Sequence, residues 1–117
     1  MSTDFKIIAE NILLIEFFGN LIKDDHAENL QQVEEYLLGG IRLCIANLSN
    51  ATYINSAGIS LLVRILTKFR SKNGEMILIK PSENIYKLLI ITKLIAIFTI
   101  AQDQEEAIKI LKNEAPV

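Results

Sequence analysis

The sequence predicts an α/β domain in which a mixed, mostly parallel sheet is covered by about four helices. Half of the 117 residues are hydrophobic and 22% are charged, which is typical of a packed globule. Short apolar runs alternate with stretches of helical periodicity, and two such runs come first, so we expect the order ββαβαβαβα with one antiparallel edge strand. No linker or repeat divides the chain, which indicates a single domain over residues 1–117 with its core at about 5–111.

The first three elements follow from turn and cap signals. Residues 5–9 and 12–18 are apolar runs separated by Glu10-Asn11, which predicts a tight hairpin. Asp25 with Glu28 three residues later has capping-box spacing and opens a helix, and Gly39-Gly40 ends it.

The centre of the chain predicts a buried strand and an amphipathic helix. Residues 41–48 are apolar nearly throughout, as expected for a strand with helices on both faces of its sheet, and residues 49–54 are expected to form a loop. Asn55 or Ser56 caps the next helix, which stops at Asn73-Gly74. Because ligands and partners of open α/β sheets meet the carboxyl ends of the strands, Asn55 and Ser56 lie at the expected working edge.

The last four elements are shorter. Residues 76–79 form a strand, Pro81-Ser82 starts a helix that runs to about Thr92, and residues 98–101 form the last strand. Asp103, with Glu106 three residues later, opens a closing helix.

Composition argues against several classes of function. The net charge of −2 gives no basic field for nucleic acid, and the Lys68, Arg70 and Lys72 run suits a solvated helix end. The apolar runs are too short to cross a membrane, the N-terminus lacks the order of a secretion signal, and the lone Cys44 fits a reducing cytoplasm. We therefore expect a cytoplasmic protein without membrane insertion.

Catalytic and cofactor motifs are not found in the sequence. There is no phosphate loop, dinucleotide fingerprint or paired-histidine motif, and His26 is the only histidine. The neighbours Asp24 and Asp25 suit a helix start, where carboxylates favour the dipole. We predict no metal, no cofactor and no enzyme activity, and a protein that acts by binding other proteins.

The Ser56 turn resembles the signature of STAS domains, specifically those of bacterial anti-sigma factor antagonists. The run concerned is Tyr53-Ile54-Asn55-Ser56-Ala57-Gly58-Ile59, followed by Leu61-Leu62. Further stretches are similar to other parts of the family pattern, namely Phe18-Gly19-Asn20-Leu21, residues 44–49, residues 73–79, residues 89–94 and Ile97-Phe98. The resemblance covers about residues 5–111, and the element order given above is also that of the family.

The resemblance implies a phosphorylation switch at Ser56. In the family this serine is phosphorylated by a kinase that doubles as the anti-sigma factor; the unphosphorylated protein binds that kinase and frees the sigma factor, and a phosphatase resets it. The partner surface that this implies consists of Thr52, Tyr53, Asn55, Ala57, Gly58, Ile59, Ser60 and Arg64. Asp24 or Asp25 is expected to supply an acidic neighbour of Ser56.

This sequence departs from the family pattern at three positions, and alternatives remain open. Asn55 replaces the usual aspartate, Ala57 a second hydroxyl residue and Lys93 a glycine. Ser56 could serve only as a helix cap in a constitutive STAS adaptor, for example a partner of an ABC-type lipid-transport ATPase. A third reading is a small-molecule site in the strand-end crevice. The apolar stretch 85–97 predicts a second contact surface or a weak homodimer.

Overall fold

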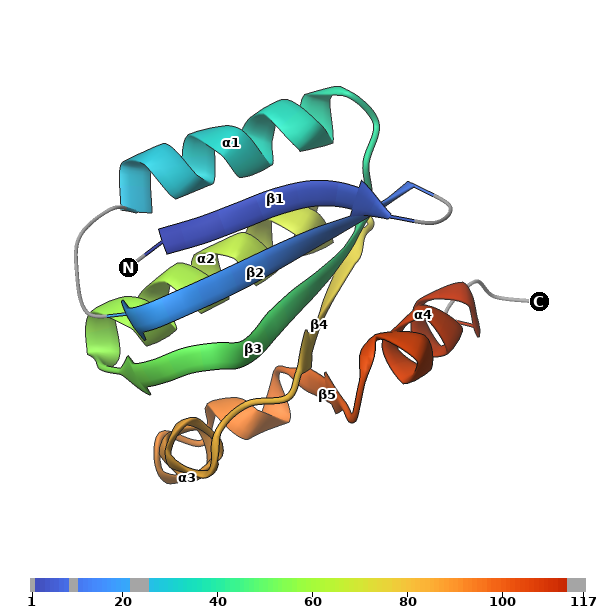
Figure 1. The fold of residues 1–117 in the computed structure, drawn as a ribbon. Helices are drawn as coiled ribbons and strands as arrows, with labels where there is room; N and C mark the ends of the chain where they lie inside the picture. Colours follow the sequence, from blue (N-terminus) through green and yellow to red (C-terminus); the bar gives the residue numbers. More distant parts are fainter. Residues whose placement is uncertain (1, 9–10, 22–25, 114–117) are drawn as a thin grey trace.

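The computed structural model describes residues 2–8, 11–21 and 26–113, and these form an α/β domain around one sheet (Figure 1). The strand order is β1-β2-β3-β4-β5; β1 is antiparallel to β2 and the later pairs are parallel, which confirms the predicted sheet. A 3₁₀ helix, η2, was not predicted. The elements are β1 (Ser2–Ile8), β2 (Ile12–Leu21), α1 (His26–Leu38), β3 (Leu43–Ile54), α2 (Ser56–Ser71), β4 (Glu75–Ile79), α3 (Glu83–Ile91), η2 (Leu94–Ala96), β5 (Thr99–Ala101) and α4 (Gln104–Asn113).

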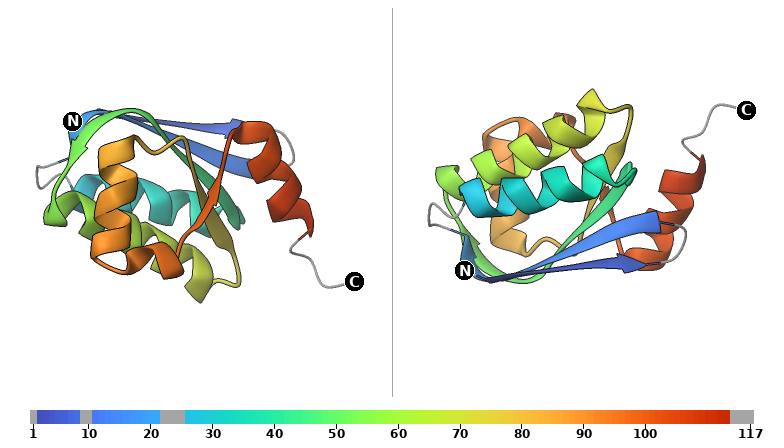
Figure 2. Two further views of the ribbon diagram at one scale, coloured as in Figure 1. Left: turned by 90° about the horizontal axis from the view of Figure 1, so that it is seen from below. Right: turned by 90° about the horizontal axis from the view of Figure 1, so that it is seen from above.

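Helices cover both faces of the sheet. Successive residues of a strand point to opposite faces, so β2 shows which helices lie where. Leu13 and Ile15 belong to the core formed with α1, α2 and α3, whereas Ile12 and Leu14 pack in a separate cluster with residues of α4. Figure 2 shows α1 and α2 side by side on one side of the strands and α4 apart from them.

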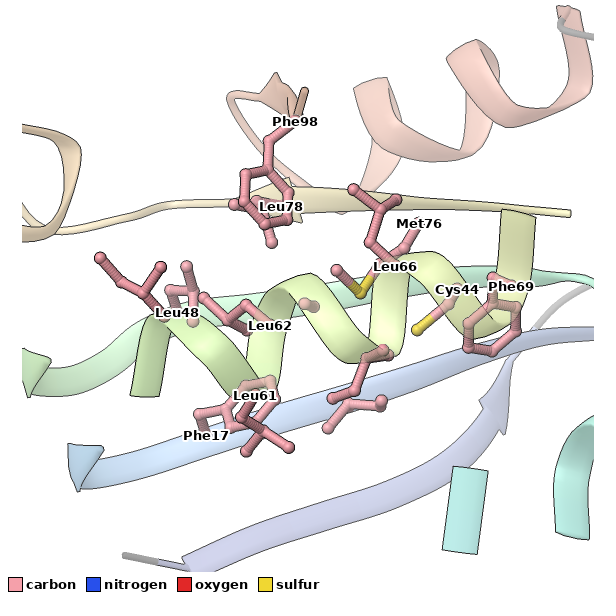
Figure 3. Packing of buried hydrophobic residues seen from close by; sticks show 14 of the residues in the cluster. Phe17, Cys44, Leu48, Leu61, Leu62, Leu66, Phe69, Met76, Leu78 and Phe98 are labelled. Carbon is pink, nitrogen blue, oxygen red and sulfur yellow. The ribbon is translucent and has the colours of Figure 1, made fainter. Parts of the chain in front are cut away.

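Helix α2 lies at the centre of the larger core. Side chains from β2, β3 and β4 and from the segment before β5 gather around its buried face (Figure 3). Phe69, near its end, is fully buried. Because close-packed side chains allow little movement, this packing fixes where the first turn of α2 lies. The α2 residues in the core are Gly58, Ile59, Leu61, Leu62, Ile65, Leu66 and Phe69.

The predicted loop over residues 49–54 is wrong, because β3 continues to Ile54. Up to Asn47 the strand has neighbours on both sides, but beyond it the ladder continues only with β2. Register shifts in that ladder, between Glu16 and Phe18 and between Gly19 and Asn20, interrupt the alternation of buried and exposed side chains. Polar side chains can therefore face solvent in this half of β3. Their frequency in residues 49–54 is typical of a loop, which is why a loop was predicted.

Most predicted helix boundaries are confirmed. Ser82 caps α3 by accepting a hydrogen bond from the Ile85 N–H at 3.2 Å, and Asp103 accepts one from the Glu106 N–H at 2.8 Å before α4. Gly40 follows α1 with a φ of 101°, a left-handed conformation that suits glycine. The predicted cap Asp25 lies outside the described residues, as does Glu10 of the predicted hairpin.

Candidate functional site

Ser56 is the first residue of α2 and lies where the parallel strands β2 and β3 end. Leu21, the last residue of β2, pairs with Ile54, the last residue of β3, and one residue separates Ile54 from Ser56. Figure 1 shows the arrowheads of both strands beside the first turn of α2. The structure thus places Ser56 at the working edge that the sequence predicted.

The cap of α2 is Asn55, which settles the choice between Asn55 and Ser56. Asn55 is extended (φ −120°, ψ −170°), and its Oδ1 accepts a hydrogen bond from the Gly58 N–H at 3.1 Å. A carboxamide oxygen accepts this bond as an aspartate oxygen would, without the charge. Ser56 itself is exposed, and its hydroxyl makes no hydrogen bond within the described part of the chain.

The charges of α2 are distributed so that its first turn favours an anion. That turn contains no acidic residue, so the helix dipole and the free N–H groups there are not neutralised by a carboxylate of the helix. Of the basic residues of α2, Arg64 is exposed at the middle of the helix, and the two in the last turn are paired: Lys68 donates to Glu34 at 2.8 Å and Arg70 to Glu75 at 3.0 Å. The hydrogen bond from Lys68 lowers the pKa of the Glu34 carboxyl.

The predicted partner residues divide into a surface set and a supporting set. Thr52, Tyr53 and Arg64 are exposed, and Asn55, Ala57 and Ser60 are half-buried around Ser56. Gly58 and Ile59 are buried on the core side of α2, so neither contributes a side chain to the surface. The predicted acidic neighbours Asp24 and Asp25 lie outside the described residues.

Thr52 and Tyr53 lie on the strand β3 and not in a loop. The Thr52 Oγ1 donates a hydrogen bond to Asn20 Oδ1 at 2.8 Å, which joins the ends of β2 and β3 beside the site. Asn20 was not among the predicted site residues, although it belongs to the Phe18–Leu21 stretch that resembles the family pattern.

Sequence reasoning did not predict a pocket at this edge, although it expected an exposed apolar patch within residues 85–97. A surface pocket of about 230 Å³ lies between β3 and α3. The exposed patch expected within residues 85–97 is confirmed for Ile90 and Ile91. Leu94, Ile95 and Ile97 are only partly buried but pack against the core. The pocket is lined by Tyr53, Ile54, Asn84, Lys87, Leu88 and Ile91.

The described residues offer little for metal or thiol chemistry. They contain no cluster of three side chains that could hold a metal ion. Cys44 is fully buried, and burial raises the pKa of its thiol, so the thiolate is disfavoured. Of the helices described, none has both the length and the apolar content that a membrane span requires.

Comparison with protein families and relatives agrees with the geometry. A model of the STAS domain matches residues 6–107. BtrV of Bordetella bronchiseptica, which is named for an expected role as an anti-sigma factor antagonist, is 24% identical over 105 residues, covering 89% of this chain and 90% of that protein.

Solved structures share the fold over most of the chain. TM1081 of Thermotoga maritima superimposes with a TM-score of 0.80 at 23% identity and 94% coverage of both chains. The anti-sigma factor antagonist SpoIIAA in its unphosphorylated form gives 0.80 at 19% identity, covering 98% of this chain and 100% of that one. The phosphorylated form of SpoIIAA from Bacillus gives 0.72 at 20% identity, with coverage of 92% and 97%. At these identities the likeness establishes the fold.

Proposed function

We propose, from the premise that this chain belongs to the STAS domain family, that it is an anti-sigma factor antagonist switched by phosphorylation of Ser56. In this proposal the unphosphorylated protein binds a kinase-type anti-sigma factor in the cytoplasm and so releases a sigma factor. The kinase phosphorylates Ser56 and dissociates, and a phosphatase restores binding. The names of BtrV and SpoIIAA, and the two forms in which SpoIIAA has been solved, support this assignment.

The observation that carries the proposal is the exposed Ser56 hydroxyl, which takes no part in capping α2. Since Asn55 supplies the cap, a phosphate on Ser56 leaves the hydrogen bond to the Gly58 N–H in place. The phosphate would lie at the positive end of the helix, where an anion is stabilised. The domain could therefore carry the modification without refolding.

The effect of the phosphate falls on the partner interface. It adds a charge of about −1.5 to −2 to a surface on which Arg64 is the one charged residue of the predicted set. Opposing or burying that charge in a complex costs a few kcal/mol, which corresponds to roughly a hundredfold loss of affinity. A binding equilibrium is thus switched by one local charge.

Two substitutions at Ser56 test the switch directly. We expect Ser56→Ala to bind the kinase as the wild type does, because it removes only an exposed hydroxyl, and Ser56→Asp to bind more weakly, because it places a negative charge at the same point. Affinities are measured by calorimetry with each purified histidine-kinase-like ATPase of the protein's own source. Equal binding by both variants would favour the constitutive adaptor.

Phosphorylation is measured in the same mixtures with ATP added. Intact mass should show one added phosphate on the wild type and none on Ser56→Ala. Ser49→Ala is the matched control, because Ser49 is an exposed serine on β3, away from the end of the strand, and its loss should leave the modification unchanged. Addition of phosphate to Ser56→Ala would contradict the assignment of the site.

A further inference from the structure

Exposed hydrophobic side chains are concentrated around α3. This helix has nine residues, of which only Ile85 and Leu89 are buried. Ile91 is 74% exposed although it belongs to an apolar run, so the core does not account for it. The large hydrophobic residues that are exposed in the described structure are Tyr53, Tyr86, Ile90 and Ile91, on α3 or on the strand β3, and Ile7 and Leu38 elsewhere.

Two of these residues line the pocket between β3 and α3. Tyr53 comes from the strand and Ile91 from the last turn of the helix, with Ile54 and Leu88 adding apolar surface. Among the described residues that line the pocket, Lys87 is the only charged one and none is a carboxylate. The pocket therefore suits a partner in which an apolar side chain lies next to a negatively charged group.

The positive group of this pocket is available to a partner. Lys87 pairs with Glu83 of the same helix at 3.1 Å, but the two side chains are 65% and 81% exposed. Exposed ion pairs of this kind contribute little to stability, so exchanging Glu83 for a carboxylate of a partner costs little.

The pocket adjoins the phosphorylation site proposed above. Ile54 lines the pocket, and only Asn55 separates it from Ser56, so the two Cα atoms lie no more than about 7.6 Å apart. Ile54 thus places one wall of the pocket within about one screening length of Ser56, which is about 8 Å at physiological ionic strength. A negative group bound at that wall would be repelled by a phosphate on Ser56.

We propose that the pocket between Tyr53 and Ile91 receives an apolar side chain of the anti-sigma factor, with a neighbouring carboxylate of that partner placed against Lys87. This inference rests on the proposed function and extends it, because it adds a second anchor to the surface around Ser56. The phosphate then acts by repelling the carboxylate that Lys87 attracts, which explains how phosphorylation at the rim releases a partner held in the pocket.

The apolar anchor is tested with Ile91→Ser, measured against the kinase that phosphorylates the wild type. We expect affinity to fall about tenfold, as for a well-buried interface residue. Leu38→Ser is the matched control, because Leu38 is 79% exposed and lies at the end of α1. Ile90→Ser is a second control, because Ile90 adjoins Ile91 but does not line the pocket. Both controls should bind as the wild type does.

The charged anchor is tested with Lys87→Glu and its matched control Lys109→Glu. Both lysines are exposed and pair with a glutamate four residues earlier on their helix, at 3.1 and 3.9 Å. We expect Lys87→Glu to weaken binding by about tenfold and Lys109→Glu to leave it unchanged, with the difference shrinking as salt is raised.

The outcomes separate this inference from the proposed function. If the wild type binds and is phosphorylated but Ile91→Ser binds equally well, the pocket assignment is overturned and the switch at Ser56 stands. If no kinase binds the wild type, both fall. If Ile91→Ser instead abolishes self-association of the free protein in sedimentation while kinase binding is unchanged, the occupant is a second copy of the chain and the inference is also overturned.

Discussion

The helices α2 and α3 start in the same way but differ in how many of their residues are buried. Each follows a parallel strand, each is capped by a side chain that accepts from the N–H three residues later, and both pack on the same face of the sheet. Seven of the 16 residues of α2 are buried, against two of nine in α3. The apolar residues of α2 are mostly buried in the core, whereas α3 also has apolar residues that remain exposed.

In these two helices apolar content and burial are separate quantities. The exposed residues of α2 are polar, including Ser56, Arg64 and Thr67, while those of α3 include Ile90 and Ile91. Exposed apolar surface next to a pocket indicates a binding surface, since it adds nothing to the stability of the free protein. We therefore assign stability mainly to α2, and we propose part of recognition for α3.

The largest expected effect contrasts the ends of these two helices. Phe69→Ala should lower the free energy of unfolding by about 3–5 kcal/mol, because the side chain is fully buried and leaves a cavity. Ile91→Ala should change it by no more than about 0.5 kcal/mol, because the side chain is mostly exposed. Urea unfolding followed by circular dichroism measures both, and similar losses would show that the two helices contribute equally to stability.

Local signals were sufficient to predict most of the fold. The helix start at Pro81-Ser82, the cap Asp103 and the glycines after α1 were read correctly, because capping depends on one side chain and the N–H groups within three residues of it. The order of strands and helices followed from hydrophobic periodicity, which also acts over short distances. The position of Ser56 at the end of a parallel strand is a consequence of that order.

What the sequence did not predict depends on contacts between distant segments. The second half of β3 is a strand because it pairs with the bulged end of β2, and the composition of residues 49–54 does not record that pairing. The bond between Thr52 and Asn20 joins residues 32 apart, and the pocket joins Tyr53 to Ile91. Asn55 and Ser56 are both good caps, so only the backbone conformation decides between them.

An intermediate effect should be shared by the two helices. Asn55→Ala and Ser82→Ala should each lower the free energy of unfolding by about 1 kcal/mol, because each removes the acceptor for one N–H of a first helical turn. Asn55→Asp is the control, since it keeps an acceptor oxygen in place. Urea unfolding measures all three. A much larger loss for Asn55→Ala would mean that this side chain also holds the end of β3, so that the two caps are not equivalent.

The smallest effect concerns how the two helices end. Asn73 after α2 and Lys93 after α3 both have left-handed backbones, with φ of 65° and 64°. Asparagine adopts this conformation readily, whereas lysine strains its Cβ against the backbone. Lys93→Gly should therefore raise the free energy of unfolding by about 0.5 kcal/mol, which is the relief of that strain less the entropy that glycine adds to the unfolded chain.

Asn73→Gly is the matched control for Lys93→Gly, because it makes the same substitution in the same backbone conformation with little strain to relieve. We expect it to leave stability unchanged or to lower it slightly, since only the entropy of the unfolded chain remains. A difference between the two midpoints of urea unfolding measures the strain at Lys93 directly. Equal changes would show that Lys93 is unstrained, and that its replacement of the usual family glycine costs α3 nothing.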